Sequence, residues 1–163
     1  MQKINRILVP LDFSDVSRAA LSMGLQLADS HGAKLYVLHV VKDLAKELQK
    51  RLVSAPNDTV VEDGIKDGER KILDAVQLEY TRAKQADNPL KTVPLNMNVT
   101  GGDWLDVCLQ LIEDEEIDLV VSGTHGGHGL KGWLLGSTTE QLVRKSSCSV
   151  FVVKPQGYPY LRD

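Results

Sequence analysis

Residues 117–140 decide the fold, and they read IDLVVSGTHGGHGLKGWLLGSTTE. The apolar run 119–121 predicts a buried strand that ends at Ser122 and Gly123. A glycine- and histidine-rich stretch follows, and Ser137 then opens an amphipathic segment. A strand, a glycine-rich loop and a helix start in this order direct backbone N–H groups, and the positive end of the helix dipole, toward an anion. We therefore interpret residues 118–139 as a loop that holds the phosphates of a nucleotide.

Short apolar segments alternate with amphipathic segments along the whole chain. Strands are expected at residues 4–9, 34–41, 93–99, 118–122 and 149–153. Helices are expected after Ser14, at residues 42–53 and 69–84, after Asp103, and at residues 137–145. This alternation predicts a parallel α/β sheet with helices on both faces and ligands at the carboxyl ends of the strands. Two loops, residues 10–14 and 123–137, leave such ends with suitable chemistry.

Local signals mark helix starts, a loop and a sheet edge. Ser14 or Asp15 can cap the first helix, and Asp103 can cap a later one. Residues 54–64 are expected to form an exposed loop, which could be a lid, a partner surface or a plain connector. Pro94 lies in an alternating segment and suits only a strand at the edge of a sheet.

Size and composition fit one globular domain, and we place it at residues 1–155 with a short tail at 156–163. The chain has 163 residues, of which 42% are apolar and 25% charged. A net charge of -3 offers no field that would attract nucleic acid or an anionic membrane. No apolar run approaches the ~20 residues of a membrane span, and residues 1–10 lack the apolar core of a signal peptide. We therefore expect a cytoplasmic protein with neither nucleic-acid binding nor membrane insertion.

Two familiar nucleotide motifs do not explain the loop. Residues 127–132 match G-x-G-x-x-G, but that fingerprint belongs in the first strand–helix turn, with an acidic residue ~20 positions later. The P-loop pattern is absent, because neither Gly-Lys-Ser nor Gly-Lys-Thr occurs in the chain. Ser137 and Glu140 have the spacing of a capping box, with Ser137 as the N-cap. The Ser137 hydroxyl would then face its own helix, whereas the backbone N–H groups would stay available to phosphate.

A different spacing resembles a known family. Gly123, Gly126 and Gly136 stand as G-x2-G-x9-G with Ser137 immediately after, and residues 9–14 read VPLDFS. In these features the chain resembles the universal stress proteins, specifically those described as ATP-binding, and the resemblance covers most of its length. It implies a single doubly wound sheet of five parallel strands in the order 3-2-1-4-5. Such a domain is Rossmann-like and similar to the adenine nucleotide alpha hydrolases.

The resemblance also implies roles for single residues. It assigns Asp12 to the ribose, with Pro10 and Leu11 beside it, and Val40 to the adenine. The residues that would surround the ribose and phosphates are Gly123, His125, Gly126, Gly136, Ser137 and Thr138. An ionised carboxylate suits ribose hydroxyls because it only accepts hydrogen bonds, although Asp12 could instead cap a helix. The implied ligand is ATP, with ADP and AMP as alternatives, and Mg²⁺ would bind through the phosphates rather than to protein ligands.

The resemblance further implies a homodimer in which the edge strand Ser149–Val153 pairs with its symmetry mate. An apolar edge strand favours such pairing because it aggregates when left uncovered. Three functions remain open: a nucleotide-dependent stress-response or signalling module without efficient catalysis, a slow ATPase, and an interaction module without a nucleotide. His125, His128 and Lys131 are the only candidates near the phosphates for assisting hydrolysis, and we assign no catalytic residue.

Other conspicuous side chains receive plainer interpretations. Two histidines three residues apart lack the further ligands that zinc needs, so we predict no metal site on the protein. Cys108 and Cys148 are too few for a disulfide framework. Trp104 is expected to be a packing residue, and Trp133 either packs, shields the ligand or contacts a partner subunit.

Overall fold

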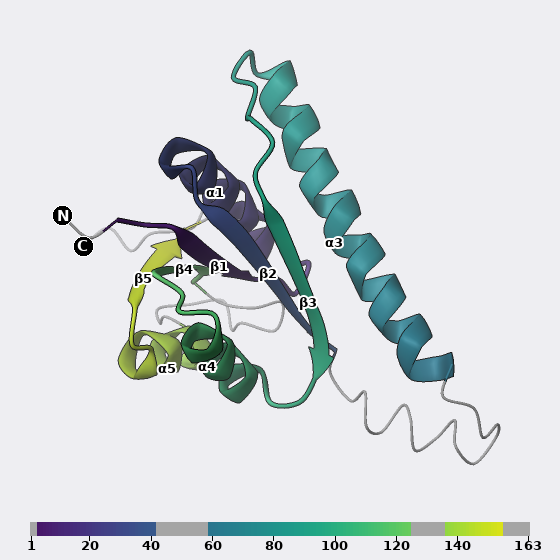
Figure 1. Cartoon of the computed structure of the whole chain (residues 1–163), viewed down its shortest axis with the longest axis vertical. Coiled ribbons are helices and arrows are strands. Elements are labelled where there is room, and N and C mark those ends of the chain that lie inside the picture. Colours follow the sequence, from purple (N-terminus) through teal and green to yellow (C-terminus); the bar gives the residue numbers. More distant parts are fainter. Residues whose placement is uncertain (1–2, 42–58, 125–135, 155–163) are drawn as a thin grey trace, which may run out of the picture.

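The computed structural model describes residues 3–41, 59–124 and 136–154, which form one five-stranded parallel sheet between two layers of helices (Figure 1). The strands are β1 (Arg6–Pro10), β2 (Lys34–Val41), β3 (Leu95–Gly101), β4 (Leu119–Gly123) and β5 (Ser149–Val153). The described helices are α1 (Asp15–His31), α3 (Thr59–Gln85), α4 (Trp104–Asp114) and α5 (Ser137–Lys145). The strand order β3-β2-β1-β4-β5 confirms the predicted topology, with β1 at the centre.

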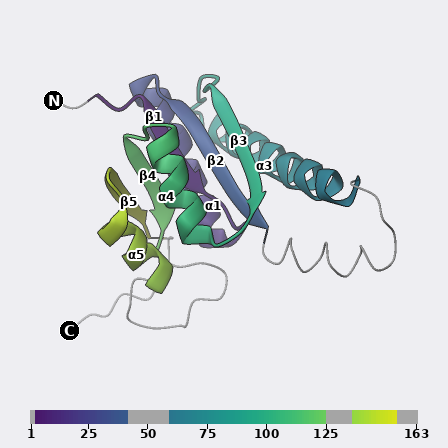
Figure 2. The same ribbon diagram turned by 60° about the horizontal axis from the view of Figure 1, so that its bottom comes forward.

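The two helix layers cover opposite faces of the sheet (Figures 1 and 2). Under α1 and α3, Val9, Val37 and Val121 contribute to one buried cluster. Under α4 and α5, Leu8 and Val120 contribute to another. Because successive side chains of a strand point to opposite faces, a strand buried on both faces must be apolar throughout. This is why β1, β2 and β4 appear in the sequence as nearly continuous apolar runs, with His39 as the polar residue inside β2.

Helix α3 differs most from the sequence-based expectation. It begins at Thr59, so residues 59–64 are helical and the predicted loop at 54–64 is wrong over that part. Asp63 and Gly64 had suggested a turn, but a single glycine inside a helix costs only about 1 kcal/mol, which the long helix outweighs. Farther along α3, buried Ile72 and Val76 anchor the helix to the sheet. The predicted helix at 42–53 lies outside the described residues.

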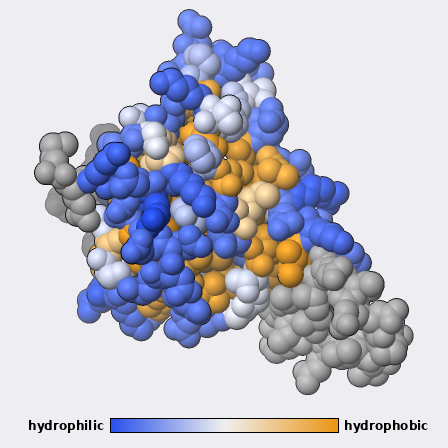
Figure 3. Space-filling model, viewed as in Figure 1, coloured by the Kyte–Doolittle hydropathy of each residue, from blue (hydrophilic) through white to orange (hydrophobic). Residues whose placement is uncertain are grey.

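Strand β3 forms one edge of the sheet, as Pro94 led us to expect. It begins at Leu95 rather than at Val93, and Pro94 precedes it, with its carbonyl oxygen 2.8 Å from the Leu35 backbone nitrogen that donates to it. Leu95, Met97 and Val99 pack toward the cluster under α3. In Figure 3 most of the visible surface is hydrophilic, and apolar residues gather along β3 where it borders α3.

Cys108 gives the folded domain a predictable response to alkaline pH. Burial raises the pKa of this thiol to about 12, and the nearby Cys148 adds to the shift. A folded-state pKa above the unfolded value of 9.0 means that stability is intact below about pH 9 and falls above it. We expect the free energy of unfolding to drop by about 1 kcal/mol between pH 8 and pH 10 through Cys108 alone.

Urea unfolding at both pH values would measure this loss, with Cys108→Ala as the matched control. The variant should be less sensitive to the pH change by the same amount, whatever its stability at pH 8. An identical pH dependence in the two proteins would contradict the assignment.

Both cysteines are free thiols. Within the described part of the chain, no helix is long and apolar enough to cross a membrane.

Candidate functional site

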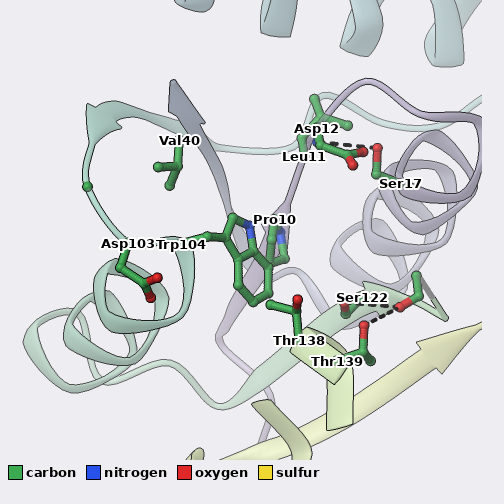
Figure 4. Close-up of a pocket in the computed structure, with 12 residues that line it drawn as sticks. Pro10, Leu11, Asp12, Ser17, Val40, Asp103, Trp104, Ser122, Thr138 and Thr139 are labelled. Carbon is green, nitrogen blue, oxygen red and sulfur yellow. Dashed lines mark hydrogen bonds between the residues drawn. The ribbon is translucent and has the colours of Figure 1, made fainter. Parts of the chain in front are cut away.

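A cavity of about 300 Å³ opens at the carboxyl ends of four neighbouring strands (Figure 4). Its lining comes from the ends of β1, β2 and β4, the turn after β3, and the starts of α1 and α5. The lining residues are Pro10, Leu11, Asp12, Ser17, Val40, Gly102, Asp103, Trp104, Ser122, Gly123, Thr138 and Thr139. Open parallel sheets bind their ligands at this end, where the winding direction reverses between β1 and β4.

The loop after β1 is shaped by hydrogen bonds among its own side chains. Asp12 Oδ1 accepts from the Ser14 backbone N–H at 3.0 Å and from the Ser14 hydroxyl at 2.5 Å. The Ser14 hydroxyl oxygen accepts from the Ser17 N–H at 3.3 Å and so caps α1. Ser14 is therefore the N-cap, and Asp12 is an exposed carboxylate on the wall of the cavity rather than a helix cap.

The end of β4 is joined to the start of α5 by two hydrogen bonds. The Gly136 N–H donates to the Thr124 carbonyl oxygen at 2.7 Å. The buried Thr139 hydroxyl donates to the Gly123 carbonyl oxygen at 3.0 Å. These contacts bring together Gly123 and Gly136, which flank residues 125–135, and they place Thr138 on the cavity.

The capping box predicted for Ser137 is wrong. Gly136 is the N-cap of α5, because its carbonyl oxygen accepts the first helical hydrogen bond, from the Glu140 N–H at 2.9 Å. Ser137 is thus the first helical residue. Glu140 does not reach back to the helix start but pairs with Arg144 at 2.9 Å.

The helix starts around the cavity differ in how their N–H groups are satisfied. Ser14 caps α1, and Asp103 caps α4 by accepting from the Leu105 and Asp106 N–H groups at 3.0 and 3.2 Å. Among the described residues, no side chain caps α5 at Gly136. First-turn N–H groups have no partner inside a helix, and they carry the positive end of its dipole. The start of α5 is therefore where this cavity can receive an anion.

The charged side chains on the cavity wall leave the start of α5 as the place for an anion. Asp12 and Asp103 supply the carboxylates, and no Lys or Arg is found among the described lining residues. An anion here would depend on backbone donors and would keep away from the two carboxylates. Within residues 3–41, 59–124 and 136–154, no group of three or more His, Cys, Asp or Glu side chains could hold a metal ion.

Most residues that the resemblance singled out converge on this cavity. Its wall includes Pro10, Leu11, Asp12, Val40, Gly123 and Thr138. Gly136 and Ser137 form the start of α5 beside it. His125 and Gly126 lie outside the described residues, as do His128, Lys131 and Trp133. Contact of any of these residues with a nucleotide remains a prediction.

The turn after β3 contributes a wall that the sequence did not reveal. Trp104, expected only to pack, is partly buried against the core under α4 and also lines the cavity. Its indole extends from the start of α4 in the direction of Pro10 and Thr138 (Figure 4). Gly102 makes the turn with a φ of 130°, a value that favours glycine. The paired glycines at 101 and 102, where the strand ends, were the available signal for a turn.

Close packing against Val16 requires glycine at position 123. A Cβ atom placed there would lie 2.4 Å from Val16 Cγ1 and 3.2 Å from the Val16 carbonyl carbon and oxygen. The start of α1 thus rests directly on the end of β4. Gly123 also lines the cavity, so this packing role leaves open the contact with ribose and phosphates that the resemblance implies.

Comparison with known proteins agrees with the fold. The universal stress protein family model matches residues 3–154. Universal stress protein MJ0577 of Methanocaldococcus jannaschii is 27% identical over 158 residues, covering 91% of this chain and 94% of that protein. The structure of UspA from Lactobacillus plantarum is similar with a TM-score of 0.67 and 26% identity, over 94% of this chain and 99% of that chain. A universal stress protein in complex with cAMP has a TM-score of 0.61 and 22% identity, over 94% and 98% of the two chains. The chain belongs to the universal stress protein family.

Proposed function

We propose that this protein binds an adenine nucleotide in the cavity at the carboxyl ends of its strands. The observation that carries the proposal is the start of α5, which has no side-chain cap among the described residues and borders the same cavity as Asp12. A helix start of this kind binds phosphate, and a carboxylate nearby binds hydroxyl groups. A ligand with both groups, such as a nucleotide, matches the two ends of the site.

The layout of the cavity suggests how the nucleotide lies. Its phosphates would accept from the N–H groups at the start of α5, and Mg²⁺ would bind through the phosphates. The ribose hydroxyls would donate to Asp12. The base would lie toward Val40 and the indole of Trp104, because a flat aromatic wall stacks on a base. A volume of about 300 Å³ is at the lower end for small-molecule sites.

The similar protein solved with cAMP supports an adenine nucleotide as the ligand class. Within that class we propose ATP, as the resemblance implies, with ADP and AMP as the alternatives. The biological role that follows is a cytoplasmic, nucleotide-dependent module in a stress response or in signalling. Slow ATP hydrolysis is the second candidate, with His125, His128 and Lys131 as the residues to test.

Native mass spectrometry of the purified protein, followed by calorimetric titration with ATP–Mg²⁺, AMP, cAMP and GTP, tests the proposal. We expect recovered nucleotide or measurable heat with the adenine compounds and weaker binding of GTP. An empty protein that shows no heat with any of them would refute nucleotide binding and leave the interaction module. Phosphate release above background, reduced in His125→Ala, would establish the ATPase.

We also propose that β5 pairs with β5 of a second copy. Strand β5 forms an edge of the sheet, and Phe151 is 43% exposed on it. We expect a dimer at micromolar concentration that Phe151→Glu converts to a monomer, because a buried unpaired charge is costly.

Light scattering measures the mass of the wild type and of Phe151→Glu, with Leu73→Glu as the control. Leu73 is similarly exposed, at 49%, but lies on α3, which packs against the opposite edge strand. A monomeric wild type would contradict the dimer.

A further inference from the structure

His39 lies on β2 directly before Val40, so its side chain points to the face of the sheet opposite to that of Val40. Its Nδ1 atom is 2.8 Å from the Leu11 carbonyl oxygen. A carbonyl oxygen can only accept, so Nδ1 must carry the proton and donate. The Leu11 N–H donates to the Leu38 carbonyl oxygen, also at 2.8 Å. Both backbone groups of Leu11 are thus held by β2.

The residue on the other side of Asp12 has an unfavourable backbone conformation. Phe13 has a φ of 64°, and the left-handed region costs an ordinary residue roughly 1–2 kcal/mol. Such a conformation persists when the surroundings hold it in place. The Phe13 ring packs on the His39 ring, with centroids 4.7 Å apart and planes at 58°. Arg18 Nε donates to the Phe13 carbonyl oxygen at 3.1 Å.

The His39 ring is itself supported from α3. A Cβ atom at Gly68 of that helix would be 3.5 Å from His39 Cδ2 and 2.6 Å from Val99 Cγ1. The helix therefore passes over the His39 ring at ordinary contact distance, and it is the closer approach to Val99 that requires glycine at position 68. The imidazole thus lies between α3 and the Phe13 ring while its Nδ1 contacts the Leu11 carbonyl oxygen.

We infer that His39 is a positioning residue, which holds Leu11 and Phe13 so that Asp12 between them faces the cavity. The inference rests on the proposed function, because it assigns the Asp12 carboxylate to the hydroxyls of a bound ribose. His39 does not line the cavity, and it acts only through the loop.

Two substitutions separate the hydrogen bond from the bulk of the side chain. His39→Leu removes the donor and keeps an apolar group. His39→Asn keeps a donor, because the amide nitrogen is as many bonds from Cα as Nδ1 is. We expect His39→Leu to weaken ATP binding about threefold to tenfold, the value of one ordinary hydrogen bond. Binding of 2′,3′-dideoxyATP should change little, because it lacks the hydroxyls that Asp12 would accept from. His39→Asn should restore most of the ATP affinity.

Titration calorimetry of wild type, both variants and Asp12→Ala with the two nucleotides makes the comparison. Asp12→Ala should show the same selective loss as His39→Leu. An equal loss for both nucleotides in His39→Leu, or no loss, would overturn the inference. So would a His39→Asn variant that binds ATP no better than His39→Leu.

Amide hydrogen exchange gives a readout that needs no ligand. The Asp12 N–H donates to Ser17 Oγ, and the Ser14 N–H donates to Asp12 Oδ1. Both amides should exchange faster in His39→Leu than in wild type and His39→Asn, while the amides of β4 stay protected. Unchanged exchange would overturn the positioning role. A wild type that binds neither nucleotide would refute the proposed function, and the exchange result would still decide whether His39 holds the loop.

Discussion

Trp104→Ala is expected to weaken binding of adenine nucleotides about tenfold to hundredfold, the measured range for loss of a base–aromatic stack. The indole lines the cavity and offers its aromatic surface near Val40, where the base is proposed to lie. Trp104→Phe should retain most of the affinity, because a smaller ring still stacks. Calorimetric titration with ATP would measure both variants.

A ligand without a base is the control for this prediction. Inorganic triphosphate should bind wild type and Trp104→Ala equally, because it would contact only the start of α5. A parallel loss for triphosphate would show that the substitution damages the whole cavity, and it would contradict a stacking role. Because Trp104 also packs against the core, urea unfolding must establish that the variant is folded under the titration conditions.

Gly123→Ala is expected to lower the free energy of unfolding by about 2–3 kcal/mol, the upper part of the range for overpacking. The added methyl group would meet Val16 Cγ1 at 2.4 Å and the Val16 backbone at 3.2 Å. The helix backbone cannot move away without disturbing the contact between α1 and β4. Urea unfolding of the protein without nucleotide gives the value directly.

A double-mutant cycle with Val16→Ala identifies the cause. Removing Cγ1 should reduce the cost of Gly123→Ala by about 1 kcal/mol, because the two groups contact each other directly. If glycine at 123 served only close approach of a phosphate, Gly123→Ala would keep wild-type stability and lose nucleotide affinity. That outcome would contradict the packing explanation.

The parallel α/β class followed from the alternation of short apolar runs with amphipathic segments, because strands buried on both faces need apolar side chains, whereas the strand order came from the resemblance. For β2, α5 and β5 the predicted and observed bounds are identical. The loop predicted at residues 54–64 was wrong over residues 59–64, which belong to α3, and the reason is physical. Asp63 and Gly64 carry a local turn preference, and local preference is weak against the packing of a long helix.

The sequence predicted the site residues that directly follow the central strands. It did not predict the residue that reaches the cavity from the edge strand. Asp12 and Gly123 follow strands that meet at the winding reversal, so their approach could be expected. Trp104 follows the edge strand, and no sequence pattern says how far a cavity extends from the reversal point. The N-cap of α5 was wrong by one residue, because only the carbonyl that accepts the first helical bond decides it.

The hydrogen bond between Gly136 and Thr124 also has a consequence for how this site can evolve. The Gly136 nitrogen lies 2.7 Å from the Thr124 carbonyl oxygen, so the residues on either side of 125–135 are joined directly. Lengthening a segment whose ends are already joined costs little, about 0.6 kcal/mol for each doubling. Insertions, deletions and grafted sequences between Thr124 and Gly136 should therefore leave the sheet intact. Natural variation or laboratory selection can then change ligand preference there without the domain having to find a new way to fold.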